Sequence, residues 1–548
     1  MTTGIAYYVD GINNLYRNKV NLCELVFKDR ALLQILHGRL SHINSVSDFV
    51  LILPDTFVTQ DISESAANLG IKIRTFELSK MVEKPMFLQQ QHWDTENDSG
   101  CDTLLGQPFA ALVEEFGFDT LIVVPLCNIL VESEAVIESI RLHKREAFDF
   151  TEICDRVPGA AWHVFDGNLL LGLEKSHPDL MRVRGALSWM LFKPLYPFKK
   201  GSCHCPRIKP SLNVDLRINS ERSIYTFSNT VKDIDEFSGP EFSYENWLKN
   251  SNWEEKYTEY GPKNIVIEPS NYCRASCLGC PHPKMTRNRE HMSQEVFSKI
   301  ASSFMPGDDC KWIFSGMGEP LLNPFISSMA KESAKYNSVL ITSMQTNFPE
   351  DFSFRSLNQI RISVDSCTPE EFEKNRSGCV WKNIKEFLMF VKKRRESNLE
   401  FPDIGVTLVR HEKTEKNIQN FIGYYKQAVK PVFNDYYFVW PFEHIRSEVS
   451  WYQVLGESSY NNILKKTCTV DFEPVKRRVC RNSALSLYVL SNGAVTFCPY
   501  DFEGQYALGN VKENSLKEIW NLDSARSLRN NNSMPKPCVD CHDWYHYL

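Results

Sequence analysis

Short β-rich runs alternate with longer helical patterns in two series along the chain, and this alternation limits what the chain can fold into. The first series lies in residues 1–215 and contains GIAYYVD, DFVLILP, IKIRTF and DTLIVVP. Strands that alternate with helices are typical of parallel sheets covered by helices. Because 548 residues are too many for one hydrophobic core, we expect an α/β protein of several domains, beginning with a parallel α/β domain at 1–215.

The second series starts at residue 263 and contains six strand candidates: NIVIEP, KWIFSG, VLITSMQTN, QIRISVD, DIGVTLVR and DYYFVWP. Helical patterns such as SQEVFSKIASSF lie between them. Six strand–helix units are two fewer than a full (β/α)8 barrel has, so they predict a partial (β/α)6 barrel over 263–470. The polar, aromatic-rich residues 216–262 are expected to connect the two series and to pack on their neighbours. Residues 471–548 are expected to form a small α+β extension.

Charge and hydropathy exclude several classes of function. The formal net charge is −6, which gives no basic footprint for nucleic acid or for an anionic membrane. The stretch DTLIVVPLCNILV is too short to span a bilayer, and MTTGIAYYVDG lacks the basic start of a secretion signal. We therefore predict a cytoplasmic protein. In that compartment, 17 cysteines point to metal or catalytic roles rather than to disulfides.

Three cysteines are clustered directly after the first strand of the second series. In NYCRASCLGCPHP, Cys273, Cys277 and Cys280 have the spacing C-x3-C-x2-C. The residues leave three explanations open: an incidental cluster, a zinc site closed by His282, or a 4Fe–4S cluster. Four thiolates would saturate such a cluster, whereas three leave one iron open. The carboxyl end of a barrel strand is where barrel active sites lie.

Together with the motifs that follow in order, this loop resembles the radical SAM superfamily. WIFSGMGEPLLNP follows the second strand, and TSMQTN, RISVDS and GVTLVRHEKTEKNIQNF lie at the third, fourth and fifth. The resemblance implies a 4Fe–4S cluster on Cys273, Cys277 and Cys280, with S-adenosylmethionine (SAM) bound at the open iron. It also implies reductive cleavage of SAM and hydrogen abstraction by a 5′-deoxyadenosyl radical.

The same resemblance implies which residues hold SAM. The backbone of the second-strand motif would approach the methionine amino group, the fourth-strand residues would bond the ribose or the methionine, and an arginine would pair with the carboxylate. In this chain these are Gly316, Met317, Gly318, Glu319, Ser363, Asp365 and Arg376. The chain departs from the family at Gly279, where an aromatic residue is common.

The C-terminal region contains a second set of cysteines. Cys480, Gly493 and Cys498 have the pattern C-x12-G-x4-C, and Cys538 and Cys541 follow as C-x2-C. Asn492–Gly493 predicts a β-hairpin between the first pair. On coordination alone, four thiols suit zinc and a 4Fe–4S cluster equally. The pattern resembles the SPASM extension of radical SAM enzymes, which implies one auxiliary 4Fe–4S cluster on these four cysteines.

Residues 1–215 resemble nucleotide-diphospho-sugar transferases and cytidylyltransferases. An acidic metal ligand precedes Pro–Leu in that family, but here Val124 precedes Pro125 and Leu126. We therefore read this domain as degenerate. The combination with the radical SAM and SPASM patterns resembles spirochaete-type SPASM proteins.

The predicted function is that of an iron–sulfur radical SAM enzyme, an oxidoreductase-type catalyst that modifies a peptide or protein. Three alternatives stay open at this stage: modification of a nucleotide sugar held by residues 1–215, a bifunctional protein with an active nucleotidyltransferase, and a non-catalytic zinc-binding protein. The expected partners are an electron donor such as flavodoxin or ferredoxin and the substrate, with no nucleic acid and no membrane.

Overall fold

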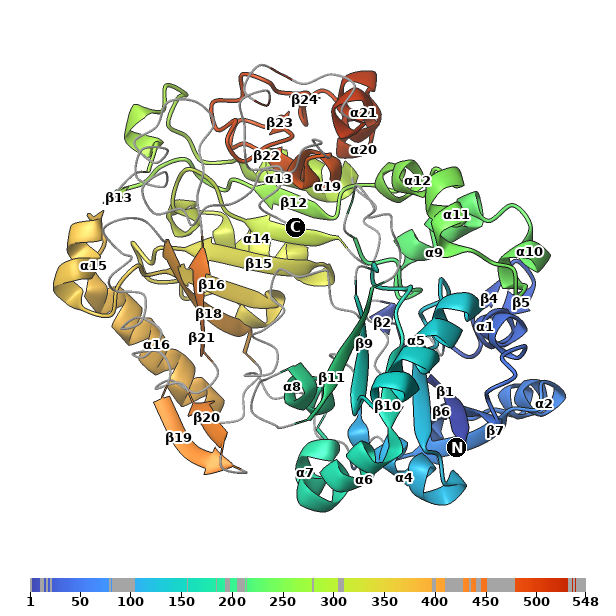
Figure 1. The fold of residues 1–548 in the computed structure, drawn as a ribbon. Helices are drawn as coiled ribbons and strands as arrows, with labels where there is room; N and C mark the ends of the chain where they lie inside the picture. Colours follow the sequence, from blue (N-terminus) through green and yellow to red (C-terminus); the bar gives the residue numbers. More distant parts are fainter. Residues whose placement is uncertain are drawn as a thin grey trace. The chain divides into compact units, whose positions relative to one another are not determined.

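The chain divides into two compact units, Met1–Tyr257 and Thr258–Leu548 (Figure 1). No helix among the residues placed by the structure is both long and apolar enough to cross a membrane. The computed structural model describes residues 2–9, 14–15, 18–19, 22–77, 80, 104–154, 156–183, 185–192, 198–204, 212, 214–277, 280–303, 310–396, 401–409, 427–432, 435–439, 445–450, 479–530, 535 and 538.

The first unit is built on a seven-stranded sheet with the order β11-β9-β10-β8-β1-β6-β7. The four predicted strand runs are confirmed as β1, β6, β7 and β8, and these pair in parallel. The sheet differs from the expected all-parallel one at β10, which is antiparallel to both β8 and β9. The short link from β9 to β10 leaves no room for a crossover helix, so the two strands pair as a hairpin. The strands are β1 (Thr3–Tyr8), β6 (Asp48–Pro54), β7 (Lys72–Phe76), β8 (Thr120–Pro125), β9 (Phe150–Cys154), β10 (His163–Asp166) and β11 (Lys200–His204).

Helices follow the strands of this sheet, as the alternation predicts. The longest are α1 (Leu32–Leu40), α2 (Gln60–Asn68), α4 (Gly106–Phe116), α5 (Ser133–Glu146) and α6 (Gly167–Ser176). They bury one apolar face each, and α5 carries its charged residues on the other.

The segment expected to connect the two series is largely helical. It forms α9 (Glu221–Thr230), α10 (Ile234–Ser238), α11 (Tyr244–Asn250) and α12 (Trp253–Glu259). Ser220, Asp233 and Ser243 cap the first three by accepting hydrogen bonds from backbone N–H groups, which explains why a polar stretch forms helices. Most of its aromatic side chains are buried, and Phe227 and Trp247 stack with 5.4 Å between their ring centroids.

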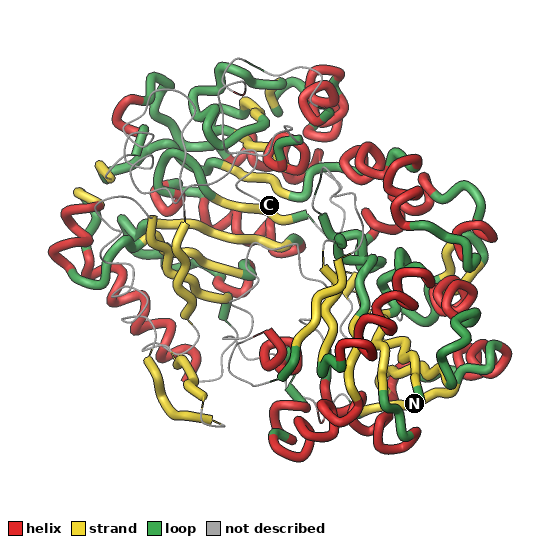
Figure 2. The backbone as a smooth tube through the Cα atoms, viewed as in Figure 1, coloured by secondary structure: helices red, strands yellow, loops and turns green. Residues whose placement is uncertain are grey.

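The second unit contains a nine-stranded sheet with the order β21-β18-β16-β15-β14-β12-β22-β23-β24. Figure 2 shows strands in yellow and helices in red. The first six strands of the sheet in chain order are parallel and adjacent in sequence order, which is the topology of the predicted partial barrel. They are β12 (Asn264–Ile267), β14 (Lys311–Phe314), β15 (Asn337–Thr342), β16 (Gln359–Ser363), β18 (Asp403–Val409) and β21 (Ile445–Ser450).

The sixth parallel strand is not the one expected from the sequence. The run DYYFVWP forms β20 (Asp435–Val439), which pairs with β19 (Gln427–Val432) as a separate two-stranded hairpin. The parallel strand beside β18 is β21 instead. Its sequence IRSEVS is polar at alternate positions, so it lacks the continuous apolar run that marks a buried parallel strand.

The predicted helices of this unit are confirmed at α13 (Gln294–Ser303) and α16 (Trp381–Glu396). Shorter helices α14 (Ile326–Glu332) and α15 (Pro369–Asn375) follow β14 and β16. Between β15 and β16 the described chain forms only the 3₁₀ turn η8 (Phe354–Ser356). Side chains from the strands and from α13, α14 and α16 share one hydrophobic core. In this core Trp312 stacks on Tyr336, with 4.2 Å between the ring centroids.

Candidate active site

The cysteine loop is fixed to the rest of the barrel by a two-residue strand. After β12 the chain runs through Cys273 to β13 (Ser276–Cys277), which pairs antiparallel with β17 (Arg376–Ser377). In this register Cys277 lies opposite Arg376. A predicted cluster ligand and the predicted SAM-carboxylate residue are therefore brought together, although 99 positions separate them.

Arg376 places a buried positive charge beside the thiols. Its Nη1 lies 3.6 Å from Cys277 Sγ and 3.3 Å from Ser343 Oγ, and its Nε forms a 2.6 Å ion pair with Asp365 Oδ2. Both side chains of the ion pair are more than 90% buried. Burial works against the charge, but the Asp365 carboxylate outweighs it, so the pKa of Arg376 is raised. The guanidinium therefore stays charged next to Cys277.

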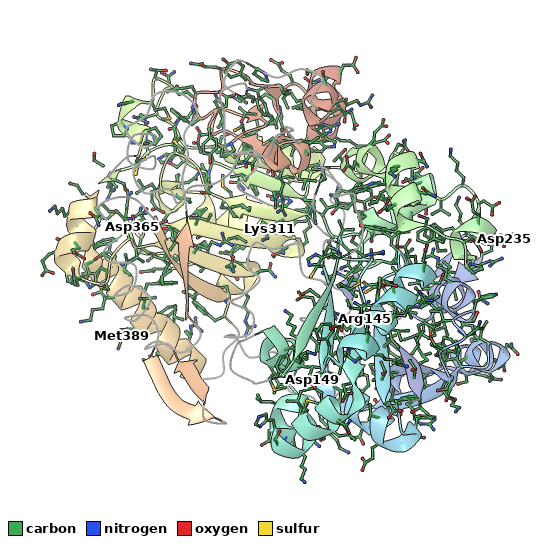
Figure 3. All side chains as sticks on the ribbon, in the orientation of Figure 1. Arg145, Asp149, Asp235, Lys311, Asp365 and Met389 are labelled. Carbon is green, nitrogen blue, oxygen red and sulfur yellow. The ribbon has the colours of Figure 1, made fainter. Side chains whose placement is uncertain are left out.

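Asp365 reaches Arg376 because the backbone turns sharply after β16. Its φ is +59°, in the left-handed region that aspartate tolerates better than most residues. The amides of Val364 and Asp365 both donate to the carbonyl of Thr407 in β18. Asp365 is labelled in Figure 3, at the start of the connection from β16 to α15. The turn thus holds the carboxylate in place at the carboxyl end of two neighbouring strands.

The other two thiols also have N–H donors. Gln345 Nε2 donates to Cys273 Sγ at 3.0 Å, while Gln345 Oε1 accepts from the backbone N–H of Arg274 at 2.8 Å. The backbone N–H of His282 donates to Cys280. Each of the three sulfurs therefore has a donor directed at it, which suits a thiolate ligand.

The protonation of the thiols depends on what they bind. Burial raises the pKa of Cys277 to about 12, and burial likewise raises the pKa of Cys280. The charges of the neighbouring loop thiols add to the rise in both pKa values. Such thiols are protonated unless a metal group supplies compensating positive charge.

The donor set fits an iron–sulfur cluster. Within the described ranges, no three or more histidine, cysteine, aspartate or glutamate side chains converge on one metal ion. The thiols of a cluster bind different iron atoms and stand farther apart than the ligands of a single ion. Three half-buried sulfurs in one loop, each with an N–H donor, suit such ligands.

The glycine motif after β14 packs directly on the chain that leads to the cysteines. A Cβ on Gly316 would lie 2.4 Å from Glu268 Cγ, and one on Gly318 would lie 2.3 Å from the carbonyl oxygen of Ser270 and 2.5 Å from that of Tyr272. The amide of Glu319 donates to the Tyr272 carbonyl at 2.8 Å. The two glycines are therefore required by close contact within the protein, a reason that the sequence does not reveal.

Glu319 is fully buried and is held by protein donors. Its carboxylate accepts hydrogen bonds from the Leu321 amide, the Thr342 hydroxyl and the Ser343 amide. Burial raises its pKa, and these hydrogen bonds oppose the rise. Glu319 therefore ties the ends of β14 and β15 together.

Of the remaining predicted residues, Ser363 ends β16 at the same strand edge, opposite Thr407 of β18. Gly279 lies outside the described residues, so the structure does not address the expected aromatic contact. Cys379, close to Arg376 in the sequence, is 4% exposed and belongs to the core. Burial raises the pKa of its thiol to about 12; the charge of Cys277 adds to the rise and that of Arg376 opposes it.

A buried ion pair connects the glycine motif to the C-terminal region. Glu268, at the end of β12, accepts from Arg287 Nη2 at 2.9 Å and from the amides of Met317 and Ser491 at 2.9 and 3.0 Å. Arg287 Nε donates to the carbonyl of Phe502. The sequence signals this network only by a charged residue at the end of the apolar run NIVIEP.

The C-terminal region extends the barrel sheet. The predicted hairpin around Asn492–Gly493 is confirmed as β22 (Ser486–Val489) and β23 (Ala494–Thr496), followed by β24 (Gly509–Asn510). β22 pairs in parallel with β12, the strand that leads to the cysteine loop.

The predicted ligands of the auxiliary cluster are partly described. Cys480 precedes α19 (Arg481–Leu485), and Cys498 follows β23 and is 7% exposed. The hairpin register returns the chain after β23 toward the start of β22, and therefore toward Cys480. Cys538 is described, with its amide donating to the Pro535 carbonyl, whereas Cys541 lies outside the described residues.

The family model of the SPASM iron–sulfur cluster-binding domain matches residues 480–542. The match begins at Cys480 and includes Cys498, Cys538 and Cys541. It confirms the predicted SPASM-type, cluster-binding region. A search of curated proteins gives no match.

Solved structures similar to the chain are distant in sequence. A cytidylyltransferase from Leptospira borgpetersenii is 17% identical, with 45% of this chain and 92% of that chain covered and a TM-score of 0.35. The protein anSMEcpe, solved with bound AdoMet (SAM), is 15% identical over 51% of this chain and 86% of its own, with a TM-score of 0.36. SuiB from Streptococcus suis, solved with its precursor peptide SuiA, is 11% identical over 69% and 84%, with a TM-score of 0.35. All three TM-scores are below 0.5, so these likenesses carry no argument for function.

Proposed function

We propose that the chain is a radical SAM enzyme in which Cys273, Cys277 and Cys280 ligate a 4Fe–4S cluster with one open iron. The observation that carries the proposal is the pairing of β13 with β17, which holds the Arg376 guanidinium 3.6 Å from Cys277 Sγ. A guanidinium that is always charged and can donate two parallel hydrogen bonds is well suited to bind a carboxylate next to the cluster. SAM carries such a carboxylate on its methionine moiety.

The residues around the cysteines would bind and orient SAM. The chemistry that the cluster supplies when bound is one-electron cleavage of SAM to a 5′-deoxyadenosyl radical. Arg376, oriented by Asp365, would hold the carboxylate, and backbone carbonyls of Gly316, Met317 and Gly318 would accept from the amino group. The Met317 amide is occupied by Glu268, which fixes the position of this loop.

Three further predicted residues complete the proposed SAM site. Ser363 and Asp365 would face the ribose or the methionine from the carboxyl end of β16. Glu319 would act by holding the ends of β14 and β15 together, because its carboxylate already accepts three protein hydrogen bonds.

The domains are proposed as a degenerate transferase-like domain at 1–215, a connecting segment at 216–262, the radical SAM barrel at 263–470 and the SPASM-type region at 471–548. In the last of these, Cys480, Cys498, Cys538 and Cys541 would ligate an auxiliary 4Fe–4S cluster. Such a cluster would either accept an electron after hydrogen abstraction or serve a structural role.

The proposed substrate is a peptide or protein, because SPASM regions accompany enzymes of that kind. A nucleotide sugar held by residues 1–215 is the second candidate. At the end of β8, Val124, Pro125 and Leu126 are buried and offer no carboxylate where a nucleotidyltransferase would bind its metal. The proposed electron donor is a flavodoxin or ferredoxin.

Anaerobic reconstitution with iron and sulfide tests the proposal. We expect about eight irons per chain, as two 4Fe–4S clusters require, and a reduced-cluster EPR signal that changes when SAM is added. The variant with Cys273, Cys277 and Cys280 replaced by alanine should keep about four irons and lose the SAM-dependent change.

Cys379→Ala is the matched control, because it removes a nearby buried thiol that the proposal does not use as a ligand. Cys379→Ala should bind as much iron as the parent protein and show the same change of the EPR signal when SAM is added. Colourless protein with stoichiometric zinc would instead support the zinc-binding alternative.

A further inference from the structure

We propose that Gln345 is a positioning residue that sets the reduction potential of the cluster by donating a hydrogen bond to the Cys273 thiolate. The inference rests on the proposed function, because it assumes a cluster on Cys273, Cys277 and Cys280. It adds a role for a residue outside the predicted ligand and SAM-binding sets.

The orientation of the Gln345 amide follows from its two partners. The backbone N–H of Arg274 can only donate, and it lies 2.8 Å from one end of the side-chain amide, so that end is the oxygen. The other end is therefore the NH2 group, which lies 3.0 Å from Cys273 Sγ. An NH2 group can only donate, so the sulfur is the acceptor. The Gln345 side chain is thus positioned to donate a hydrogen bond to a thiolate sulfur, which is the form that Cys273 would take as a cluster ligand.

The backbone around Gln345 holds the side chain in this position. Gln345 is 8% exposed, and the preceding Met344 is 1% exposed with φ of +55°, a left-handed conformation that is rare for a long side chain. Two hydrogen bonds maintain the turn: the Met344 amide donates to Thr342 Oγ1, and Asn383 Nδ2 donates to the Met344 carbonyl. The turn directs residue 345 back toward the cysteine loop.

Gln345 differs from the other donors to the three sulfurs. Arg376 is charged and is also paired with Asp365, and the donor to Cys280 is a backbone amide, which a change of side chain other than to proline leaves in place. Gln345 is the neutral side-chain donor among those described at the three sulfurs, so it can be changed without altering the proposed SAM-carboxylate contact. Hydrogen bonds to cluster sulfurs stabilise the more negative, reduced state and so raise the reduction potential.

Two substitutions separate the donor from the shape of the side chain. Gln345→Met has similar length and no donor, and Gln345→Glu keeps an oxygen for the Arg274 amide but turns a second oxygen toward Cys273. Gln294→Glu, at the exposed start of α13, makes the same change of charge away from the site and serves as the control.

The measurement is an EPR-monitored redox titration of the reconstituted full chain without SAM. The variant lacking the three loop cysteines identifies the signal of the auxiliary cluster, so that the other signal can be followed alone. For Gln345→Met we expect the equilibrium ratio of reduced to oxidised cluster to fall about tenfold at a given potential, which is about 59 mV for one electron. Gln345→Glu should lower this ratio further, and Gln294→Glu should leave the ratio unchanged.

An unchanged potential in both Gln345 variants with a fully loaded cluster would overturn the inference. Loss of the cluster from both variants, with the fold retained by circular dichroism, would also overturn it, because Gln345 would then be needed for assembly rather than for tuning. If the parent protein itself loads no cluster at the loop cysteines, the proposed function fails instead.

Discussion

Removing the Glu268 carboxylate should loosen the glycine motif and the C-terminal hairpin together. Glu268 is 2% exposed and Arg287 is 7% exposed, so their ion pair is buried. The same carboxylate accepts from the amides of Met317, beside the glycines, and Ser491, in the hairpin turn. In Glu268→Ala, the Arg287 charge and both amides lose this acceptor.

The size of the effect follows from these contacts. Breaking a buried ion pair by removing one partner costs about 3–5 kcal/mol, because the other charge stays buried without compensation. At the lower end of that range, the equilibrium for local opening increases roughly 100-fold. Glu268→Gln keeps one acceptor oxygen and the packing but also leaves the Arg287 charge without its partner, so we expect an increase that is only partly smaller than in Glu268→Ala.

Hydrogen exchange measured by mass spectrometry is the appropriate assay, because a chain with two compact units does not have a single unfolding free energy. Peptides that cover 311–322 and 486–497 should exchange faster in Glu268→Ala, and peptides from residues 1–257 should not change. Glu295→Ala is the control, since Glu295 is 82% exposed and its 3.7 Å pair with Lys299 contributes little.

The Glu268 and Arg287 variants should also be strongly coupled. In the double variant Glu268→Ala/Arg287→Ala no buried charge is left alone, so its cost should be well below the sum of the two single costs. Exchange in 311–322 that rises less than threefold in Glu268→Ala would refute the reasoning, as would a rise confined to only one of the two segments.

The remaining predictions concern packing, pH and iron content. Gly318→Ala should lower the thermal midpoint of the second unit by more than Gly316→Ala does. The new Cβ at residue 318 would meet backbone oxygens at 2.3 and 2.5 Å, whereas the one at residue 316 would meet a side chain. Gly172→Ala should instead stabilise its helix by about 0.5–1 kcal/mol, because the new Cβ would have nothing within 4 Å. Burial lowers the pKa of His163 from 6.5 to about 4. Between these two pH values the unfolded chain binds a proton that the folded chain does not. The stability that is present above pH 6.5 is therefore lost as the pH falls toward 4. His163→Phe should therefore flatten the dependence of the first unit's thermal midpoint on pH over this window, and an unchanged slope would contradict the assignment. Cys498→Ser should reduce the iron content of reconstituted protein from about eight to about four per chain, whereas Cys154→Ser, outside the SPASM match, should leave it unchanged.

Much of the fold could be predicted from the sequence because its strands are short apolar runs and its helices are amphipathic. The strands at NIVIEP, KWIFSG and QIRISVD are confirmed, and Asn492–Gly493 correctly predicts the hairpin that joins the C-terminal region to β12. The sixth strand was misplaced because DYYFVWP is more apolar than IRSEVS, although the latter pairs with β18. Local hydrophobicity cannot decide between them, since the choice is made by pairing with a distant strand.

In the site, too, the local pattern could be predicted from the sequence, whereas the contacts between distant segments could not. The spacing of Cys273, Cys277 and Cys280 could be read directly, because the three proposed ligands lie within eight residues of sequence. The partners of these thiols come from elsewhere: Arg376 by way of the β13–β17 pairing, and Gln345 by way of a turn with positive φ at Met344. Neither the pairing nor the turn has a signal in composition or periodicity. For the same reason the sequence could not show that Glu268 lies beneath Gly316.

The most direct test of the central claim is SAM cleavage by the reconstituted protein. With dithionite and SAM under anaerobic conditions, the parent protein should release 5′-deoxyadenosine, detected by liquid chromatography, in at least stoichiometric amount. The variant lacking Cys273, Cys277 and Cys280 should release none, and Cys379→Ala should release as much as the parent. Iron-loaded parent protein that forms no 5′-deoxyadenosine, or equal release from the triple variant, would contradict the account.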